Sequence, residues 1–356
     1  MNKLVKKLML VAAMLMLAAG PSFSADAIRI GLMCPLTGKW ASEGQDMQQI
    51  VSLLVSEVNK AGGINGKQIE LIVEDDAGDP RTASLAAQKL ASAGVMAVIG
   101  TYGSAVTEAS QNIIDEAEIM QIATGSTSVR MTEKGLPLFF RTCPRDDEQG
   151  RVASKVIAAK GFKKVAILHY NSSYAKGLAE EAQKGLKDAG VPVVFYDALT
   201  PSERDYTAIL TKLKAADPDL IFFTGYYPEK KEMHWDVPMM GGDAANNTDL
   251  VKIAGKDAAK GYFFISPPSA HDFDTPEAKD FFSRYKAQYN SLPSSVWSVQ
   301  AGTDANPEAV AKYLKKDLKE YPGLTGKLGF NEKGDRIGDL YKVYEVDGNG
   351  GFVLQK

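Results

Sequence analysis

Two short polar stretches of the chain have the residue types and the spacing to hold a small polar ligand. The apolar run Val95 to Ile99 breaks into Gly100 to Ser104 (GTYGS), and the run Ile119 to Ala123 breaks into Thr124 to Ser128 (TGSTS). Short apolar runs bounded by turn residues are typical of buried strands, and ligands of open α/β sheets bind beyond the carboxyl ends of the strands. A helix expected from Val106 would direct free backbone N–H groups to the same edge, which favours an anion such as a carboxylate.

The hydroxyl residues of these stretches have a simpler interpretation. Ser104 and Thr127 could do no more than cap the helices that follow them. The recurrence of the pattern about twenty residues later favours ligand binding, because two neighbouring strand ends would offer hydroxyl groups to one crevice.

The residues that usually carry catalysis lack the required arrangement. His169, His234 and His271 are far apart in sequence, and none lies in an HExxH motif or near paired cysteines. The chain has neither a GxSxG nucleophile motif nor a GxxxxGK[ST] phosphate loop. We therefore expect a protein that is not an enzyme and has no catalytic residue, cofactor or metal, with His169 in a structural role.

The first 25 residues are predicted to be a cleaved signal peptide. Three lysines in the first seven residues precede the apolar run Leu8 to Ala19, which is short for a membrane span, and Ser22 to Ala25 supply small residues for cleavage. No Cys lies in the cleavage region, and no later stretch is long and apolar enough to span a bilayer. The sequence predicts an exported, periplasmic protein.

Length and charge restrict the classes of partner. The 356 residues include 41 Lys and Arg, three of them in the leader, against 44 Asp and Glu. An acidic balance argues against nucleic acid as a partner, and the length favours two domains.

Strands and helices alternate along the chain, which indicates parallel sheets. Asp79 and Pro80 have the pattern of an N-cap followed by a proline in the first turn, and Tyr341 to Val346 with Phe352 to Gln355 reads as a closing hairpin. The predicted strands before that hairpin are 27–33, 68–74, 95–99, 119–123, 165–169, 191–196 and 220–224, with helices at 45–61, 80–93, 106–117, 148–160, 175–189, 205–216, 275–289 and 307–316. The second half repeats the architecture of the first, and two such lobes in tandem create a cleft.

Two connections are too short for a helical crossover. Nine residues separate Tyr227 from Val237, and the apolar run Val296 to Gln300 meets a polar turn before any helix can form. We expect either residues absent from the sequence at about 229–230 and 300–302, or sheets that are destabilised there.

Cys34 and Cys143 are the only cysteines, and each precedes a proline at a predicted strand end. An oxidising compartment permits a disulfide, but strand ends in one sheet can lie too far apart for one. The sequence leaves this pairing open.

An ordered set of motifs resembles the type I periplasmic solute-binding proteins, above all the leucine/isoleucine/valine-binding proteins of ATP-driven amino-acid importers. The motifs are PLTG, KAGGINGK, DDAGDP, VIGTYGS, HYNSSYAKGLAEEAQKGL, FFTGYYPE, MMGGDA and TGKLGFNEKGD. The resemblance implies two Rossmann-like α/β lobes with parallel central sheets, joined by three hinge strands and closing on a free amino acid.

The resemblance also implies a set of binding residues. Ser104, Thr127 and Tyr226 would bind the ligand carboxylate, and the Gly125 carbonyl, the Thr127 hydroxyl and the Asp243 carboxylate would bind its ammonium group. A zwitterion that leaves water must have both ends paired, since hydrogen bonds to charged groups contribute ~1.5 to 3 kcal/mol each.

The side-chain pocket departs from the family pattern. Related proteins usually carry Glu where Asp243 stands, an aromatic residue where Glu43 stands, and a smaller apolar residue where Tyr102 stands. Tyr174 would cover the ligand from the second lobe. Trp40, Glu43 and Tyr102 together predict a pocket that is less purely aliphatic than one for leucine.

The resemblance divides the mature chain into an N-terminal lobe (26–143 with 267–339) and a C-terminal lobe (144–266 with 340–356). The leading hypothesis is a monomeric periplasmic receptor that delivers a free amino acid, branched-chain or otherwise hydrophobic, to a membrane permease. A sensor of the same fold that reports to a receptor or regulator is the main alternative. An exported hydrolase is a weaker one, because nucleophile and base motifs are missing.

Overall fold

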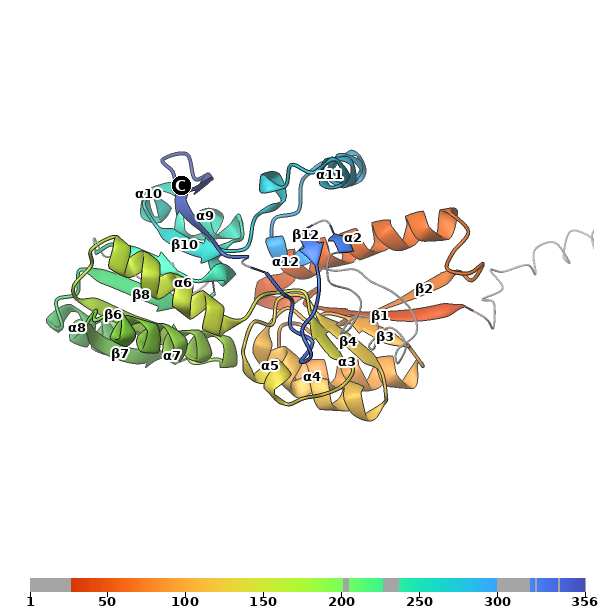
Figure 1. Cartoon of the computed structure of the whole chain (residues 1–356), viewed down its shortest axis with the longest axis horizontal. Helices are drawn as coiled ribbons and strands as arrows, with labels where there is room; N and C mark the ends of the chain where they lie inside the picture. Colours follow the sequence, from red (N-terminus) through yellow and green to blue (C-terminus); the bar gives the residue numbers. More distant parts are fainter. Residues whose placement is uncertain are drawn as a thin grey trace, which may run out of the picture.

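The computed structural model describes residues 27–200, 205–226, 237–299, 321–323, 325–338 and 340–355. Two α/β sheets, each with its own helices, lie next to each other along the longest axis of the molecule (Figure 1). Within the described ranges, no helix combines the length and the apolar character needed to cross a membrane. The predicted signal peptide lies outside them.

The first sheet has five parallel strands in the order β2-β1-β3-β4-β5. They are β1 (Ile28–Cys34), β2 (Ile69–Asp75), β3 (Ala97–Ile99), β4 (Met120–Ala123) and β5 (Phe139–Arg141). The parallel arrangement predicted from the alternating pattern is confirmed. Because order along the sheet reverses between β1 and β3, the crevice for a ligand is expected beyond the carboxyl ends near these strands.

Helices cover both faces of this sheet. The helices around it are η1 (Gly38–Trp40), α2 (Ala41–Lys60), α3 (Pro80–Ser92), α4 (Ser104–Glu116), α5 (Arg130–Glu133), α11 (Pro276–Tyr289) and α12 (Val296–Val299). α3 packs on α4 on one face, and α2 packs on α11 and α12 on the other (Figure 1). The predicted cap of α3 is confirmed, because an Asp79 carboxylate oxygen accepts a hydrogen bond from the Thr82 N–H at 2.9 Å.

The second sheet has seven strands in the order β14-β13-β10-β9-β8-β6-β7. They are β6 (Val165–Tyr170), β7 (Val193–Leu199), β8 (Leu220–Thr224), β9 (Met239–Gly241), β10 (Phe263–Ser266), β13 (Lys342–Val346) and β14 (Phe352–Leu354). The first five are parallel and repeat the strand order of the first sheet, and the antiparallel pair β13–β14 confirms the predicted hairpin.

The helices and short elements around the second sheet complete the fold. They are α6 (Asp146–Ala159), α7 (Ser173–Asp188), α8 (Thr207–Ala215), η3 (Asp243–Ala245), α9 (Asp249–Ala254), α10 (Lys256–Ala259) and η4 (Ala270–Asp272). The strands β11 (Tyr321–Gly323) and β12 (Gly326–Leu328) form a separate antiparallel pair. α6 and α7 lie close together because α6 carries Gly150 where a Cβ would come within 2.7 Å of the Glu181 Cβ.

Several predicted boundaries were wrong by a few residues. α4 begins at Ser104 and α6 at Asp146, each two residues before the expected start, and α2 begins at Ala41. The run from Val296 forms a helical turn, since the Ser295 hydroxyl accepts a hydrogen bond from the Trp297 N–H at 3.1 Å.

Other predictions fall outside the described ranges. These are the two short connections at 229–230 and 300–302 and the helix expected at 307–316. Cys34 and Cys143 are both buried and are free thiols.

The tight α6–α7 contact gives a matched pair of substitutions. Gly150→Ala would drive its methyl group into the α7 backbone, where the Glu181 carbonyl carbon lies 2.8 Å from the added Cβ, and should lower the free energy of unfolding by ~1 to 3 kcal/mol. Gly177→Ala on α7 meets only an Asp146 oxygen at 3.9 Å and should raise stability by ~0.5 to 1 kcal/mol. Urea denaturation of both variants measures this, and a stabilised Gly150→Ala would contradict the packing.

Candidate functional site

A small cavity lies between the two sheets. Its volume is about 170 Å³, and it is lined by Tyr102, Gly125, Tyr174, Tyr226, Asp243, Ala244 and Trp297. Tyr102 and Gly125 follow β3 and β4 of the first sheet, while Tyr226 and Asp243 follow β8 and β9 of the second. The carboxyl ends of strands from both sheets therefore meet at this cavity, as doubly wound folds require of a ligand site.

Aromatic rings from both sheets pack directly on one another at the cavity. The Trp40 ring, from η1, lies with its centroid 4.4 Å from that of Tyr226 and 5.4 Å from that of Tyr102. The Tyr174 ring lies 5.2 Å from that of Tyr226. Trp40 does not line the cavity itself but supports two rings that do.

Asp243 is the charged group of the cavity wall. One of its carboxylate oxygens accepts a hydrogen bond from the Tyr174 hydroxyl at 2.9 Å, and the other accepts from the Tyr341 hydroxyl at 3.1 Å and from the Gln149 side-chain amide. Burial raises the pKa of Asp243 to about 7, although these hydrogen bonds oppose the shift. The group therefore changes charge near neutral pH.

A second carboxyl group, which sequence analysis missed, is coupled to Asp243. Asp146 is the first residue of α6; it is fully buried, and neither of its carboxylate oxygens has a hydrogen-bond partner among the described residues. Burial first and the Asp243 charge second raise the pKa of Asp146, and the Thr127 hydroxyl and the Arg141 charge oppose this. Two buried carboxyl groups that form no ion pair are costly, which favours a cationic ligand.

The two hydroxyl residues come from the first sheet. The Thr127 hydroxyl is buried close to Asp146 and makes no hydrogen bond of good geometry to any described residue, whereas the Ser104 hydroxyl accepts a hydrogen bond from the Ser128 N–H at 3.2 Å. α4 begins at Ser104, and its N-cap Gly103 offers no side-chain cap. The N-terminus of this 13-residue helix therefore has the polarity to receive an anion.

Glu43 does not line the cavity. It is fully buried in the first turn of α2, and one carboxylate oxygen accepts a hydrogen bond from the Asn247 side-chain amide at 2.8 Å, while the other has no partner in the described part of the chain. Burial raises the pKa of Glu43 to about 8, against the effect of hydrogen bonds from Ser295 and Asn247. Glu43 thus joins α2 of the first sheet to the loop after η3 of the second.

The structure brings most of the predicted residues together. Five line the cavity, Thr127 and Ser104 lie in the loop and helix start beside it, Trp40 lies behind it, and Glu43 is displaced to the contact with Asn247. The residues that sequence analysis missed are Asp146, Tyr341, Ala244 and Trp297. Only Asp146 gave a usable signal, since it opens the acidic run Asp146 to Glu148 shortly after the apolar run Leu136 to Arg141.

The remaining candidates for chemistry are unremarkable. His169 is buried, its Nδ1 lies 3.3 Å from the Tyr170 carbonyl oxygen, and burial lowers its pKa. Among the residues that the structure describes, no cluster of His, Cys, Asp and Glu could hold a metal ion.

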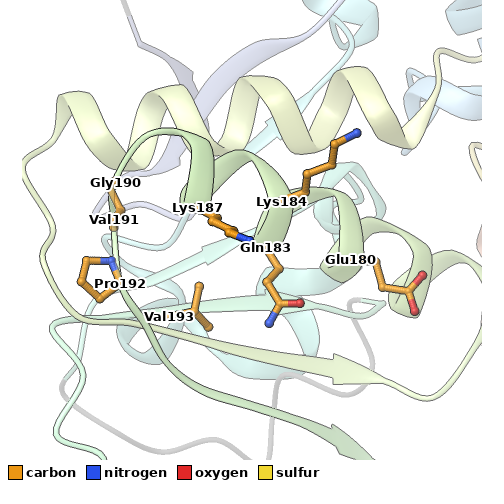
Figure 2. Close-up of a pocket in the computed structure, with 8 residues that line it drawn as sticks. All are labelled: Glu180, Gln183, Lys184, Lys187, Gly190, Val191, Pro192 and Val193. Atoms are coloured by element: carbon orange, nitrogen blue, oxygen red, sulfur yellow. The ribbon is translucent and has the colours of Figure 1, made fainter.

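A larger hollow lies on the surface, away from the cavity, against α7 and β7 (Figure 2). Side chains of α7, such as Gln183 and Lys187, line it beside Pro192 and Val193. It is an open groove to which no buried polar side chain contributes, so the cavity between the two sheets is the candidate site.

The fold and the site define a class of protein. The strand-end loops of two α/β lobes surround a small cavity that holds unpaired carboxyl groups. This arrangement is typical of a binding protein that closes on its ligand. The chain belongs to the periplasmic binding protein family, a class of exported substrate-binding proteins, whose family model matches residues 27–351.

Curated relatives and solved structures agree with this. The chain is 35% identical over 349 residues to a leucine-, isoleucine-, valine-, threonine- and alanine-binding protein of Pseudomonas aeruginosa, covering 92% of each chain. It is 33% identical to a Leu/Ile/Val-binding protein of Rhizobium johnstonii, with 92% of this chain and 94% of that protein covered. The branched-chain amino acid transporter substrate-binding protein LivJ from Streptococcus pneumoniae, solved with isoleucine, is 29% identical with a TM-score of 0.80 over 92% of this chain and 100% of that one. The predicted family and fold are confirmed.

The burial of Glu43 predicts that the stability of the protein depends on pH, and one substitution removes this dependence. The folded protein keeps this carboxyl group protonated up to a pKa of about 8, whereas the unfolded chain releases the proton near ~4.3, so stability falls as pH rises from about 4.5 through 8. Glu43→Gln removes this titration. We expect its Tm advantage over the wild type to grow by several degrees between about pH 5 and 8.5 in calorimetric scans.

The exposed Glu116→Gln serves as the control, which should show no such growth. Parallel Tm-versus-pH curves for Glu43→Gln and the wild type would contradict the burial of a protonated Glu43.

Proposed function

We propose that the protein is the periplasmic substrate-binding component of an ABC amino-acid importer and binds a free amino acid between its two lobes. The observation that carries this proposal is the buried pair Asp146 and Asp243, which forms no ion pair among the described residues, beside the N-terminus of α4, which has no side-chain cap. A zwitterion supplies both missing charges. The named relatives bind amino acids, in particular leucine, isoleucine and valine.

The carboxylate end of the ligand belongs at the first lobe. The start of α4 at Ser104, the unpartnered Thr127 hydroxyl and the hydroxyl of Tyr226 across the cleft are the groups proposed to receive it. Charge-assisted hydrogen bonds of this kind are about twice as strong as neutral ones.

The ammonium end belongs between the two carboxyl groups. We assign it to Asp243, Asp146 and the Gly125 carbonyl oxygen, with Tyr174 over the ligand. Asp243 and Tyr174 come from the second lobe, so a ligand bound at the first lobe gains these contacts only when the lobes meet. Contacts that exist only in the closed state are what makes a ligand shift the population toward closure.

The side-chain end is enclosed by Tyr102, Trp297 and Ala244. The tyrosine and tryptophan rings favour an apolar or mixed side chain.

The remaining parts of the proposal follow from this role. We assign residues 26–143 with 267–339 to the first lobe and 144–266 with 340–356 to the second, residues 1–25 to a cleaved export signal, and a membrane permease as the partner of a monomeric, non-catalytic protein. A sensor that reports to a regulator would use the same cleft. Calorimetric titration with each of the twenty amino acids, on protein refolded free of carried-over ligand, tests the proposal; binding of none would contradict it.

Asp243→Asn should weaken binding of L-leucine strongly while leaving the fold intact. Asparagine keeps the shape and most hydrogen bonds but removes the charge that pairs with the ammonium group, a loss of ~3 kcal/mol or about 150-fold in Kd. The exposed Asp217→Asn is the control and should bind as the wild type does. Equal affinity of Asp243→Asn and the wild type would remove Asp243 from the site.

The proposed ammonium contact also predicts a pH dependence of affinity. Because the pKa of Asp243 is about 7 before the ligand arrives, binding below that pH requires the carboxyl group to release a proton. The Kd for L-leucine should therefore rise by up to ~10-fold per unit as pH falls below about 7, with proton release visible as a buffer-dependent binding enthalpy. In Asp243→Asn this dependence should flatten, and a wild-type Kd that is constant from pH 5 to 8 would count against the assignment.

A further inference from the structure

Arg141, the last residue of β5, is fully buried and engages acceptors with all three of its side-chain nitrogens. Nε donates to the Asp335 carboxylate at 2.7 Å, and Nη2 lies 2.6 Å from the same carboxylate oxygen and donates to the Thr132 hydroxyl at 2.7 Å. Nη1 donates to the carbonyl oxygens of Ser126 at 3.1 Å and Ser128 at 2.7 Å. These two carbonyls flank Thr127, so one buried cation holds the loop between them.

The hydrogen bonds fix the orientation of Thr127. With the carbonyls on either side bound to Arg141, the Thr127 carbonyl accepts a hydrogen bond from the Asp146 N–H at 3.0 Å. The Ser128 N–H donates to the Ser104 hydroxyl at 3.2 Å. The loop is thereby held between α4, α6 and the guanidinium group, and the Thr127 hydroxyl is left available.

Asp335 holds Arg141 from a distant part of the chain. It lies 194 residues further along, in the segment between β12 and β13, which runs beside β5 through a parallel bridge between Arg141 and Asp335. Its carboxylate also accepts hydrogen bonds from the Thr132 hydroxyl at 2.7 Å and from Arg145 Nη1 at 3.0 Å. Burial would raise the pKa of Asp335, but Arg141, Thr132 and Arg145 hold it below its ordinary value, so the ion pair persists at neutral pH.

We propose that Arg141, anchored by Asp335, is a positioning residue of the ligand site: it holds the loop from Gly125 to Ser128 so that Thr127 and the Gly125 carbonyl meet the ligand. Arg141 is absent from the lining of the cavity and acts through the loop. A planar guanidinium group is needed, because an ammonium group cannot serve the carboxylate and two carbonyls in fixed directions. The ligand part of this inference rests on the proposed function.

Arg141→Lys in the full mature chain tests the proposal. The substitution keeps the charge beside Asp335 but loses the fork, and should raise the Kd for L-leucine at least 10-fold. It should also accelerate amide exchange at Thr127 and Ser128 in the ligand-free protein at least 10-fold, with other amides of β4 and α4 unchanged. Arg29→Lys, at an exposed ion pair with Glu70 in the same sheet, is the control and should change neither.

A second variant covers a failure of Arg141→Lys to fold. Arg141→Met with Asp335→Leu replaces the buried pair by apolar side chains of similar size, an exchange that is often neutral for stability. A purely structural pair would leave the Kd and loop exchange at wild-type values in this variant, and that result would overturn the proposal; a weakened Kd at near-wild-type Tm supports it.

The two proposals fail separately. If the wild type binds none of the twenty amino acids, the proposed function is wrong, and local amide exchange in the ligand-free variants still decides the role of Arg141. Faster exchange confined to the loop supports positioning, and unchanged exchange there overturns it.

Discussion

The structure depends on the burial of two carboxyl groups that form no ion pair with any residue in the described part of the chain. Asp146 begins the first helix of the second sheet and Asp243 follows β9, so both face the region where the two sheets meet. The nearest strong cation, Arg141, is already engaged by Asp335 and by loop carbonyls. A charge that stays uncompensated inside a folded protein is costly, so a binding partner that brings a cation gains affinity from relieving that cost.

The repeated strand order explains how residues from both halves of the chain reach this point. In each sheet the second strand in sequence lies outside the first and the later strands follow on the other side, so strand-end loops gather at one edge. The two edges face each other across the cavity, with Tyr102 and Gly125 on one side and Tyr226 and Asp243 on the other. Each loop needs to contribute only one or two side chains to the cavity, because the sheets already hold the loops in position.

The sequence predicted the sheets and the strand-end loops well, because each depends on residues close together in the chain: an apolar run, then glycine and hydroxyl residues. It could not predict pairs that form over long separations. Arg141 with Asp335 and Glu43 with Asn247 join residues 194 and 204 positions apart. Asp146 was missed for the same reason, since an acidic residue in the first turn of a helix needs no further explanation until its burial is known.

The contrast between the two groups of buried charge indicates their different roles. Arg141, Asp335 and Arg145 compensate one another within the protein, which fixes backbone positions without requiring a ligand. Asp146 and Asp243 both belong to the second of the two proposed lobes, and the Asp243 charge raises the pKa of Asp146. Closure without a ligand buries both carboxyl groups against the first lobe with no ammonium group to pair with them, whereas closure on a zwitterion supplies one. The cost of burying the pair therefore opposes empty closure and favours liganded closure, and only such a difference in free energy between the two states lets a ligand control the equilibrium.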